Sequence, residues 1–139
     1  MDHPHRMRQS DEMRQRAEAA TSIAMDAGYC IHSLLGPGAL EHTYLAFLAE
    51  EIRFRGLPVR AQVPIPVRHR GVTLEVGYRI DLLVDEALVI EVKATDRPHP
   101  IHRSQLVSYL RLSGHRIGLL INFHVEHLRD GIQRVLNDW

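Results

Sequence analysis

Three ionisable side chains, Asp81, Glu91 and Lys93, stand in two hydrophobic segments, YRIDLLV and LVIEVKA. Both segments are typical of strands, and a short turn at 85–86 would make them antiparallel neighbours, with Asp81 opposite position 90, within one residue. Two carboxylates that meet on one sheet face repel each other unless a cation lies between them, and oxygen ligands suit Mg²⁺ or Mn²⁺. Lys93 should project from the same face as Glu91, where an ammonium can orient a metal-bound water and stabilise charge developing on a phosphate.

The composition also draws attention to Lys93. Lys and Arg together number 17, and Lys93 is the only lysine among them. A lysine is a compact point charge whose pKa responds to its surroundings, which an arginine is not. The alternative is a stray surface lysine, with Glu91 and Lys93 on the solvent face of an amphipathic strand. A helix expected at 101–112 weakens that alternative, because a crossover helix covers one face of the strand before it.

Hydrophobic periodicity predicts the elements that position these residues. Apolar residues recur with helical spacing in four segments, and they alternate or run continuously in four others. A strand, a helix and a strand in succession predict a parallel crossover. We therefore predict an α/β fold in which a mixed sheet is flanked by helices, in the order α-α-β-β-β-α-β-α. The expected helices are 11–35, 39–55, 101–112 and 125–137, and the expected strands are 59–67, 72–81, 87–94 and 116–123.

The length of 139 residues fits one domain. We expect residues 1–10 to form a flexible tail and residues 11–139 to form a single domain. On the second expected helix, Glu41 falls between Leu48 and Ile52, near the middle of the apolar stripe. A carboxylate there is expected to be buried or directed at something.

Charge and cysteine usage limit the class of protein. The formal net charge is zero, which weighs against tight nonspecific binding of nucleic acid but leaves room for a local basic patch. The single cysteine, Cys30, cannot form an internal disulfide. No run of ~18 apolar residues and no apolar secretory leader are visible. A cytoplasmic protein with no membrane partner is therefore expected.

The chain resembles the PD-(D/E)XK nuclease superfamily and, within it, the GxxExxY family. Gly38, Glu41 and Tyr44 match the motif that names the family, and the segments QLVSYLRLSG and GLLINF fit as well. The resemblance covers roughly residues 15 to 137. It implies a restriction-endonuclease-like fold in which Asp81, Glu91 and Glu41 bind Mg²⁺ or Mn²⁺. By the same likeness, Lys93 assists the attacking water and Gln105 points toward the metal or its waters.

The expected activity is that of a metal-dependent nuclease acting on DNA or RNA through a metal-activated water. Basic residues between the third and fourth strands, among them Arg97, His102 and Arg103, are candidates for phosphate contacts. Their alternative is a solvated helix face. The alternative function is a weakly active or inactive nucleic-acid-binding or assembly module with the same fold. A small domain also needs its own surface, a homodimer or a protein partner for substrate recognition.

Overall fold

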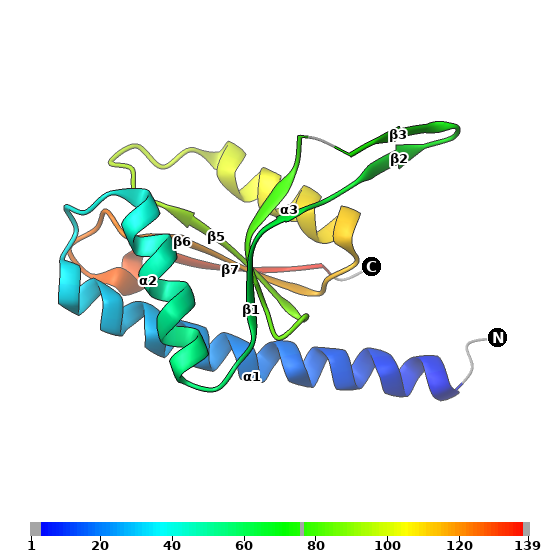
Figure 1. The fold of residues 1–139 in the computed structure, drawn as a ribbon, viewed down its shortest axis with the longest axis horizontal. Coiled ribbons are helices and arrows are strands. Elements are labelled where there is room, and N and C mark those ends of the chain that lie inside the picture. Colours follow the sequence, from blue (N-terminus) through cyan, green and yellow to red (C-terminus); the bar gives the residue numbers. More distant parts are fainter. Residues whose placement is uncertain (1–3, 76, 138–139) are drawn as a thin grey trace.

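A five-stranded mixed sheet forms the centre of the computed structural model, which describes residues 4–75 and 77–137 (Figure 1). The strand order is β1-β4-β5-β6-β7. β5 and β6 are parallel, as the crossover predicts, and the other neighbours are antiparallel. Every residue of β6 is buried, as its continuous apolar run predicts. The strands are β1 (Val59–Pro64), β4 (Arg79–Val84), β5 (Leu88–Lys93), β6 (Ile117–Asn122) and β7 (Ile132–Leu136).

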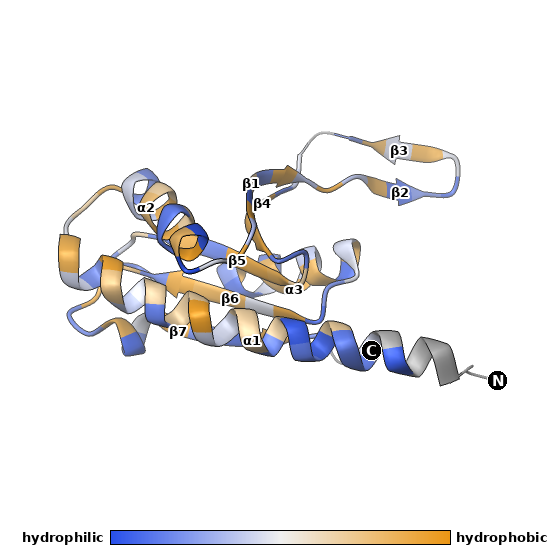
Figure 2. Ribbon diagram, turned by 60° about the horizontal axis from the view of Figure 1, so that its bottom comes forward, coloured by the Kyte–Doolittle hydropathy of each residue, from blue (hydrophilic) through white to orange (hydrophobic). Residues whose placement is uncertain are grey.

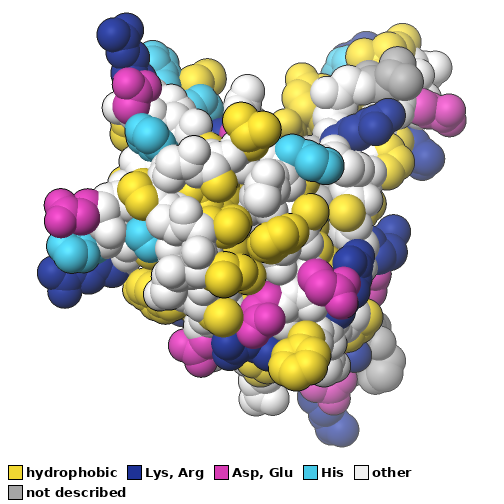
Figure 3. Space-filling model, turned by 60° about the vertical axis from the view of Figure 1, so that its left-hand side comes forward, with side chains coloured by type: hydrophobic (Ala, Val, Ile, Leu, Met, Phe, Trp, Pro, Cys, Tyr) yellow, Lys and Arg dark blue, Asp and Glu magenta, His cyan; other side chains and the backbone are white. Residues whose placement is uncertain are grey.

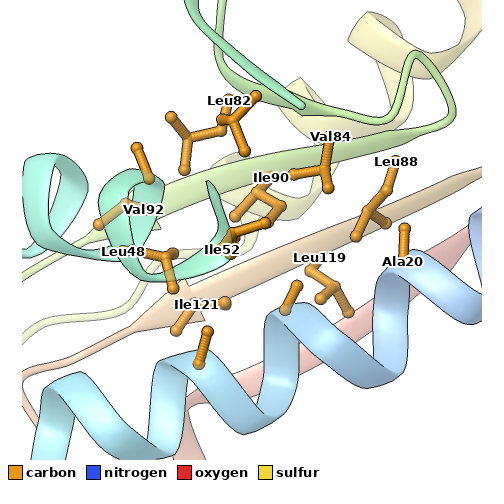
Figure 4. Close-up of a cluster of buried hydrophobic side chains, with 14 of the residues drawn as sticks. Ala20, Leu48, Ile52, Leu82, Val84, Leu88, Ile90, Val92, Leu119 and Ile121 are labelled. Atoms are coloured by element: carbon orange, nitrogen blue, oxygen red, sulfur yellow. The ribbon is translucent and has the colours of Figure 1, made fainter. Parts of the chain in front are cut away.

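Helices cover both faces of the sheet. α1 (Pro4–Leu35) and α2 (Glu41–Phe54) pack on one face, and α3 (Pro100–Ser113) packs on the other (Figures 1 and 2). α3 ends where the sequence predicts, because Gly114 adopts a left-handed conformation and its N–H caps the Leu110 carbonyl. Figure 4 shows the larger core cluster between the first two helices and the sheet, with Ala20, Leu48, Ile52, Leu82, Val84, Leu88, Ile90, Val92, Leu119 and Ile121 labelled.

The hairpin between the expected strands 59–67 and 72–81 exists, but it is divided. β2 (Val67–His69) and β3 (Val72–Leu74) form a separate two-stranded sheet. Gln62 has a φ of 55°, and Val59 packs in one core cluster whereas Val63 and Ile65 pack in the other. The left-handed residue therefore changes the face of the sheet to which the following side chains point. A strict alternation of inward and outward residues does not predict this change.

The helix expected at 125–137 is wrong. The segment forms a short 3-10 helix, η1 (Leu128–Gly131), followed by β7, which pairs antiparallel with β6. Leu128 and Val135 are buried as expected, but Leu136 is 45% exposed. The reason is tertiary: β6 is buried, so the backbone groups on its second edge need partners, and a strand supplies them where a helix cannot.

The first helix begins earlier than expected. α1 starts at Pro4, so residues 4–10, expected as a flexible tail, are helical, and residues 1–3 lie outside the described residues. Proline suits the first turn of a helix, and the Arg, Met and Gln residues that follow favour its continuation. Within residues 4–75 and 77–137, no helix is both long enough and apolar enough to cross a membrane.

Candidate active site

Asp81 and Glu91 meet where β4 and β5 stop pairing. The ladder runs from Val84 opposite Leu88 to Leu82 opposite Ile90. One further step puts Asp81 opposite Glu91, within the one-residue margin of the sequence prediction. At that step side chains replace the backbone ladder. The Asp81 N–H donates to Glu91 Oε1 at 3.1 Å, and the Val92 N–H donates to Asp81 Oδ2 at 2.9 Å.

These two hydrogen bonds fix one oxygen of each carboxylate. The other oxygens, Asp81 Oδ1 and Glu91 Oε2, take part in neither of these bonds, and the two carboxyl groups lie within hydrogen-bonding reach of each other. Glu91 is only 6% exposed. Burial, followed by the charge of Asp81, raises the pKa of Glu91 from 4.5 to about 8. The pair is thus an oxygen-only donor set in which the nearby positive charge does not offset the burial of Glu91 and the charge of Asp81.

Lys93 lies on the same side of the sheet as Glu91, as predicted. Their alternate neighbours Leu88, Ile90 and Val92 belong to the cluster under α1 and α2, whereas Val89 belongs to the one under α3. Glu91 and Lys93 therefore face the α3 layer. The half-buried Lys93 is close enough for its charge to oppose the rise in the pKa of Glu91.

A small cavity of about 100 Å³ adjoins Lys93 at the carboxyl end of β5. Asn122, the register partner of Lys93 on β6, lies in its wall and is 8% exposed. Its side chain accepts from the Thr95 N–H at 3.1 Å and donates to the Thr95 carbonyl at 2.9 Å. Asn122 therefore holds the chain that follows Lys93. Asn122 was not among the residues predicted from the sequence, although a polar side chain at the end of the run IGLLIN is a usable signal.

His102 lines this cavity and lies within electrostatic reach of Glu41. The pKa of His102 is lowered, first by burial and then by the charges of Lys93 and His99, while the charge of Glu41 opposes the shift. The first turns of α2 and α3 therefore approach the same end of β5. Of the two expectations for Glu41, burial is wrong, because Glu41 is the first residue of α2, no helical turn precedes it and its side chain is exposed.

Tyr44 explains the spacing of the motif around Glu41. It is fully buried, and its ring stacks on Phe123 with centroids 4.4 Å apart. Its hydroxyl donates to the Gly36 carbonyl and accepts from the Ala39 N–H at 3.0 Å. Tyr44 thus stabilises the turn that leads into α2, and this turn determines the position of Glu41 at the start of the helix.

Two further tyrosines border the carboxylates. Tyr109 of α3 makes an edge-to-face contact with Tyr78, with centroids 6.0 Å apart. Burial, then the charges of Glu91 and Asp81, raise the pKa of Tyr109. Tyr109 of α3 therefore lies within electrostatic reach of both carboxylates, a position that was not predicted from the sequence.

The remaining expected residues lie around α3. Gln105 is exposed, three residues after His102, and it forms no hydrogen bond within the described residues. Arg97 is exposed in the loop before α3. Arg103 lines a groove of about 740 Å³ together with Ser104, Ser108, Arg111 and Gln133, and the groove shares Pro98 and His99 with the cavity beside Lys93. In the part of the chain that the structure describes, no three His, Cys, Asp or Glu side chains gather closely enough to hold a metal ion. The structure thus brings Asp81, Glu91 and Lys93 together and leaves Glu41 and Gln105 outside that group.

Comparison with known families gives one match. A family model described as the PD-(D/E)XK nuclease superfamily matches residues 18–135. The match covers most of the sequence, so the chain belongs to the PD-(D/E)XK nuclease superfamily. Membership indicates a nuclease-type function, and nucleases of this superfamily generally use divalent metals. No curated protein and no solved structure matches the chain.

Proposed function

We propose that the protein is a metal-dependent nuclease that hydrolyses phosphodiester bonds of DNA or RNA. One observation carries the proposal: the reciprocal hydrogen bonds between β4 and β5 place the carboxylates of Asp81 and Glu91 together on the face of Lys93. Within the superfamily we assign the chain to the GxxExxY family on Gly38, Glu41 and Tyr44. We also propose a cytoplasmic location, because the only cysteine, Cys30, is exposed as a free thiol.

The donor set fits a hard divalent cation. Asp81 and Glu91 offer carboxylate oxygens, the ligands that Mg²⁺ and Mn²⁺ prefer. The raised pKa of Glu91 marks a place where a second positive charge would relieve repulsion. Glu41 is the candidate third carboxylate, from the first turn of α2. When bound, the cation would polarise the phosphate and lower the pKa of a water.

The protein's own side chains supply the rest of the chemistry. Lys93 is proposed to donate a hydrogen bond to the attacking water and to offset negative charge that develops on the phosphate. Gln105 is proposed to orient water from α3. His102 beside Lys93, and Arg97 and Arg103 at the start of α3, are proposed to contact phosphates of the substrate.

A nuclease panel tests this assignment. Single-stranded and duplex DNA and RNA are incubated with Mg²⁺, with Mn²⁺ and with chelator. We expect metal-dependent cleavage that Glu91→Ala and Lys93→Ala each reduce by at least ~100-fold. Arg129→Ala changes an exposed residue of η1, so this variant is the control and should cleave at the wild-type rate. Circular dichroism checks that each variant remains folded.

Two outcomes would reject the proposal. Wild-type cleavage rates in both site variants would show that the activity does not come from this site. Calorimetric binding of Mg²⁺ or Mn²⁺ without cleavage of any substrate would favour the alternative, a binding or assembly module that retains the fold.

A further inference from the structure

The β2–β3 hairpin projects from the body of the molecule as an arm, which we define as residues 66–75 (Figures 1 and 2). Its two strands pair only with each other. Within the described residues, no hydrogen bond or ion pair joins residues 67–74 to the rest of the protein. An isolated two-stranded ribbon is marginal in water, so the arm is a surface suited to a partner.

The root of the arm, in contrast, is fixed. Ile65 is 4% exposed, and its N–H donates to the Tyr78 carbonyl at 2.8 Å. The ring of Tyr78 contacts Tyr109 of α3. Because the root is packed against the body, a ligand held by the arm has a defined position relative to the active site.

The arm has one apolar face and a basic tip. Val67 pairs with Leu74 and His69 with Val72, so these four side chains share a face. Val72 is 61% exposed and Leu74 is 54% exposed. Figure 3 shows basic and hydrophobic side chains side by side on the projecting part at the upper right.

Three consecutive basic residues, Arg68, His69 and Arg70, occupy the tip, and all are exposed. Glu75 is the single acidic residue of the arm. Neither Arg68 nor Arg70 takes part in an ion pair within the described residues. The arm therefore presents cationic donors that the protein itself does not satisfy.

The arm also lies next to the site along the chain. β4 begins at Arg79, two residues before Asp81. The extended chain from Asp81 back to Arg70 spans at most about 40 Å, which is comparable with one helical turn of duplex DNA. A duplex gripped at the tip can therefore pass over the carboxylates.

We propose that the arm binds in the major groove of duplex DNA and holds it across Asp81 and Glu91. The inference rests on the proposed nuclease function. The major groove of B-form DNA admits a two-stranded ribbon, and its base edges offer guanine acceptors for arginine and thymine methyl groups for apolar side chains. The apolar face of the arm can thus lie against the base edges, while Arg68 on the opposite face and Arg70 at the turn are left for the phosphates that flank the groove. A-form RNA has a deep, narrow major groove that side chains do not read, so duplex RNA fits poorly.

Other partners would match only one of the two classes of side chain on the arm, the basic or the apolar. An acidic protein would pair with Arg68 and Arg70 but leave Val72 and Leu74 exposed. A second copy of the chain would cover the apolar face but bring like-charged tips together, which costs free energy. These occupants become outcomes of the test.

Fluorescence anisotropy in chelator measures binding without cleavage. The probes are a short duplex DNA, the single strand and the duplex RNA of the same sequence. We expect duplex DNA to bind most tightly. The double variant Arg68→Ala/Arg70→Ala should raise the Kd for duplex DNA at least ~10-fold. It should also reduce the slope of log Kd against log salt concentration by roughly two, which corresponds to two lost phosphate contacts. The matched control Arg14→Ala/Arg129→Ala removes the same charge from α1 and η1 and should stay within about twofold of wild type.

The result that overturns the proposal is equal loss of affinity in the two double variants, or equal binding of duplex RNA. Sedimentation that shows a dimer dissociated by Val72→Thr/Leu74→Thr would instead make the arm a self-association surface. The nuclease panel is scored separately. Arm-dependent DNA binding without cleavage rejects the nuclease assignment and keeps the arm, whereas cleavage with arm-independent binding rejects the arm alone.

Discussion

Among single residues, Glu91 shows a conflict between stability and chemistry. Its carboxyl is buried beside Asp81, and burial is the larger cause of its raised pKa. Ionising it in the absence of a cation costs folding free energy, because the folded protein holds the proton more tightly than the unfolded chain does. The same property makes the pair a receptive site for a cation, since binding a metal displaces the proton.

The stability of the metal-free protein should therefore fall with rising pH. The folded pKa of Glu91 is about 8 and its ordinary value is 4.5, so the contribution of this group is fully present below the ordinary value and is lost as the pH rises through the folded one. Glu91→Gln stays neutral throughout. Urea denaturation in chelator should show it to be more stable than wild type above about pH 8, by up to roughly 5 kcal/mol, and similar to wild type near pH 4.

A divalent cation provides the control for that experiment. Mg²⁺ or Mn²⁺ should stabilise the wild type at high pH and leave Glu91→Gln nearly unchanged, because the variant lacks the charged ligand. If the stability of the wild type and that of Glu91→Gln vary with pH in the same way, the pKa of Glu91 in the folded protein is not raised.

At the scale of elements, local signals predicted β5, α3 and β6. The apolar run of β6 and the left-handed Gly114 after α3 are features of the chain itself. The C-terminal segment behaved differently, since Leu128, Ile132, Val135 and Leu136 fit a helical spacing. The open edge of β6 decides its structure, and a one-dimensional pattern does not contain that edge.

Gly131, the last residue of η1 between β6 and β7, should not tolerate a side chain. A Cβ at Gly131 would lie 2.1 Å from the backbone oxygen of Asn122. Backbone cannot swing away as a side chain does, so Gly131→Ala should destabilise the protein by about 3 kcal/mol. It should also disturb the loop that Asn122 holds beside Lys93. Thermal unfolding measures the first effect and cleavage rate the second.

Gly38→Ala is the matched control. Nothing lies within 4 Å of a Cβ at Gly38, so the melting temperature should stay close to wild type. Equal destabilisation in the two variants would show that the close approach at Gly131 does not govern the turn.

In the whole molecule, the site occupies the end of the sheet where β4 and β5 separate and the first turns of α2 and α3 approach (Figure 1). One helical layer carries Glu41 and the other carries His102, and the sheet between them carries the carboxylates and Lys93. The sandwich therefore assembles its candidate chemistry from three layers that are distant in sequence.

Two neighbouring substitutions test the architecture of the last strand. Val135 is fully buried, whereas Leu136 is 45% exposed on the other side of β7. Val135→Lys should destabilise the protein by about 4 kcal/mol, because it buries an unpaired charge, and Leu136→Lys should change stability by less than about 0.5 kcal/mol. Chemical denaturation compares the two, and similar losses would point to a helix that buries both positions.

Local patterns in the sequence were enough to predict the parts of the protein that depend on neighbours along the chain. These are the strands that carry Asp81, Glu91 and Lys93, their common face, the crossover through α3 and the approach of the two carboxylates within one residue of register. Period-two geometry and a tight turn are local, so the order of residues is enough to place them.

The other features of the fold and of the site depend on contacts that exist only in the folded protein. The tertiary structure turned the last expected helix into β7, divided the hairpin to form the arm, left Glu41 exposed at the start of α2, and brought Asn122 to the chain that follows Lys93. Each of these depends on a backbone edge, a left-handed residue or a packed partner far away in sequence. Such contacts satisfy hydrogen bonds and bury surface only after the chain has folded, so no local pattern records them.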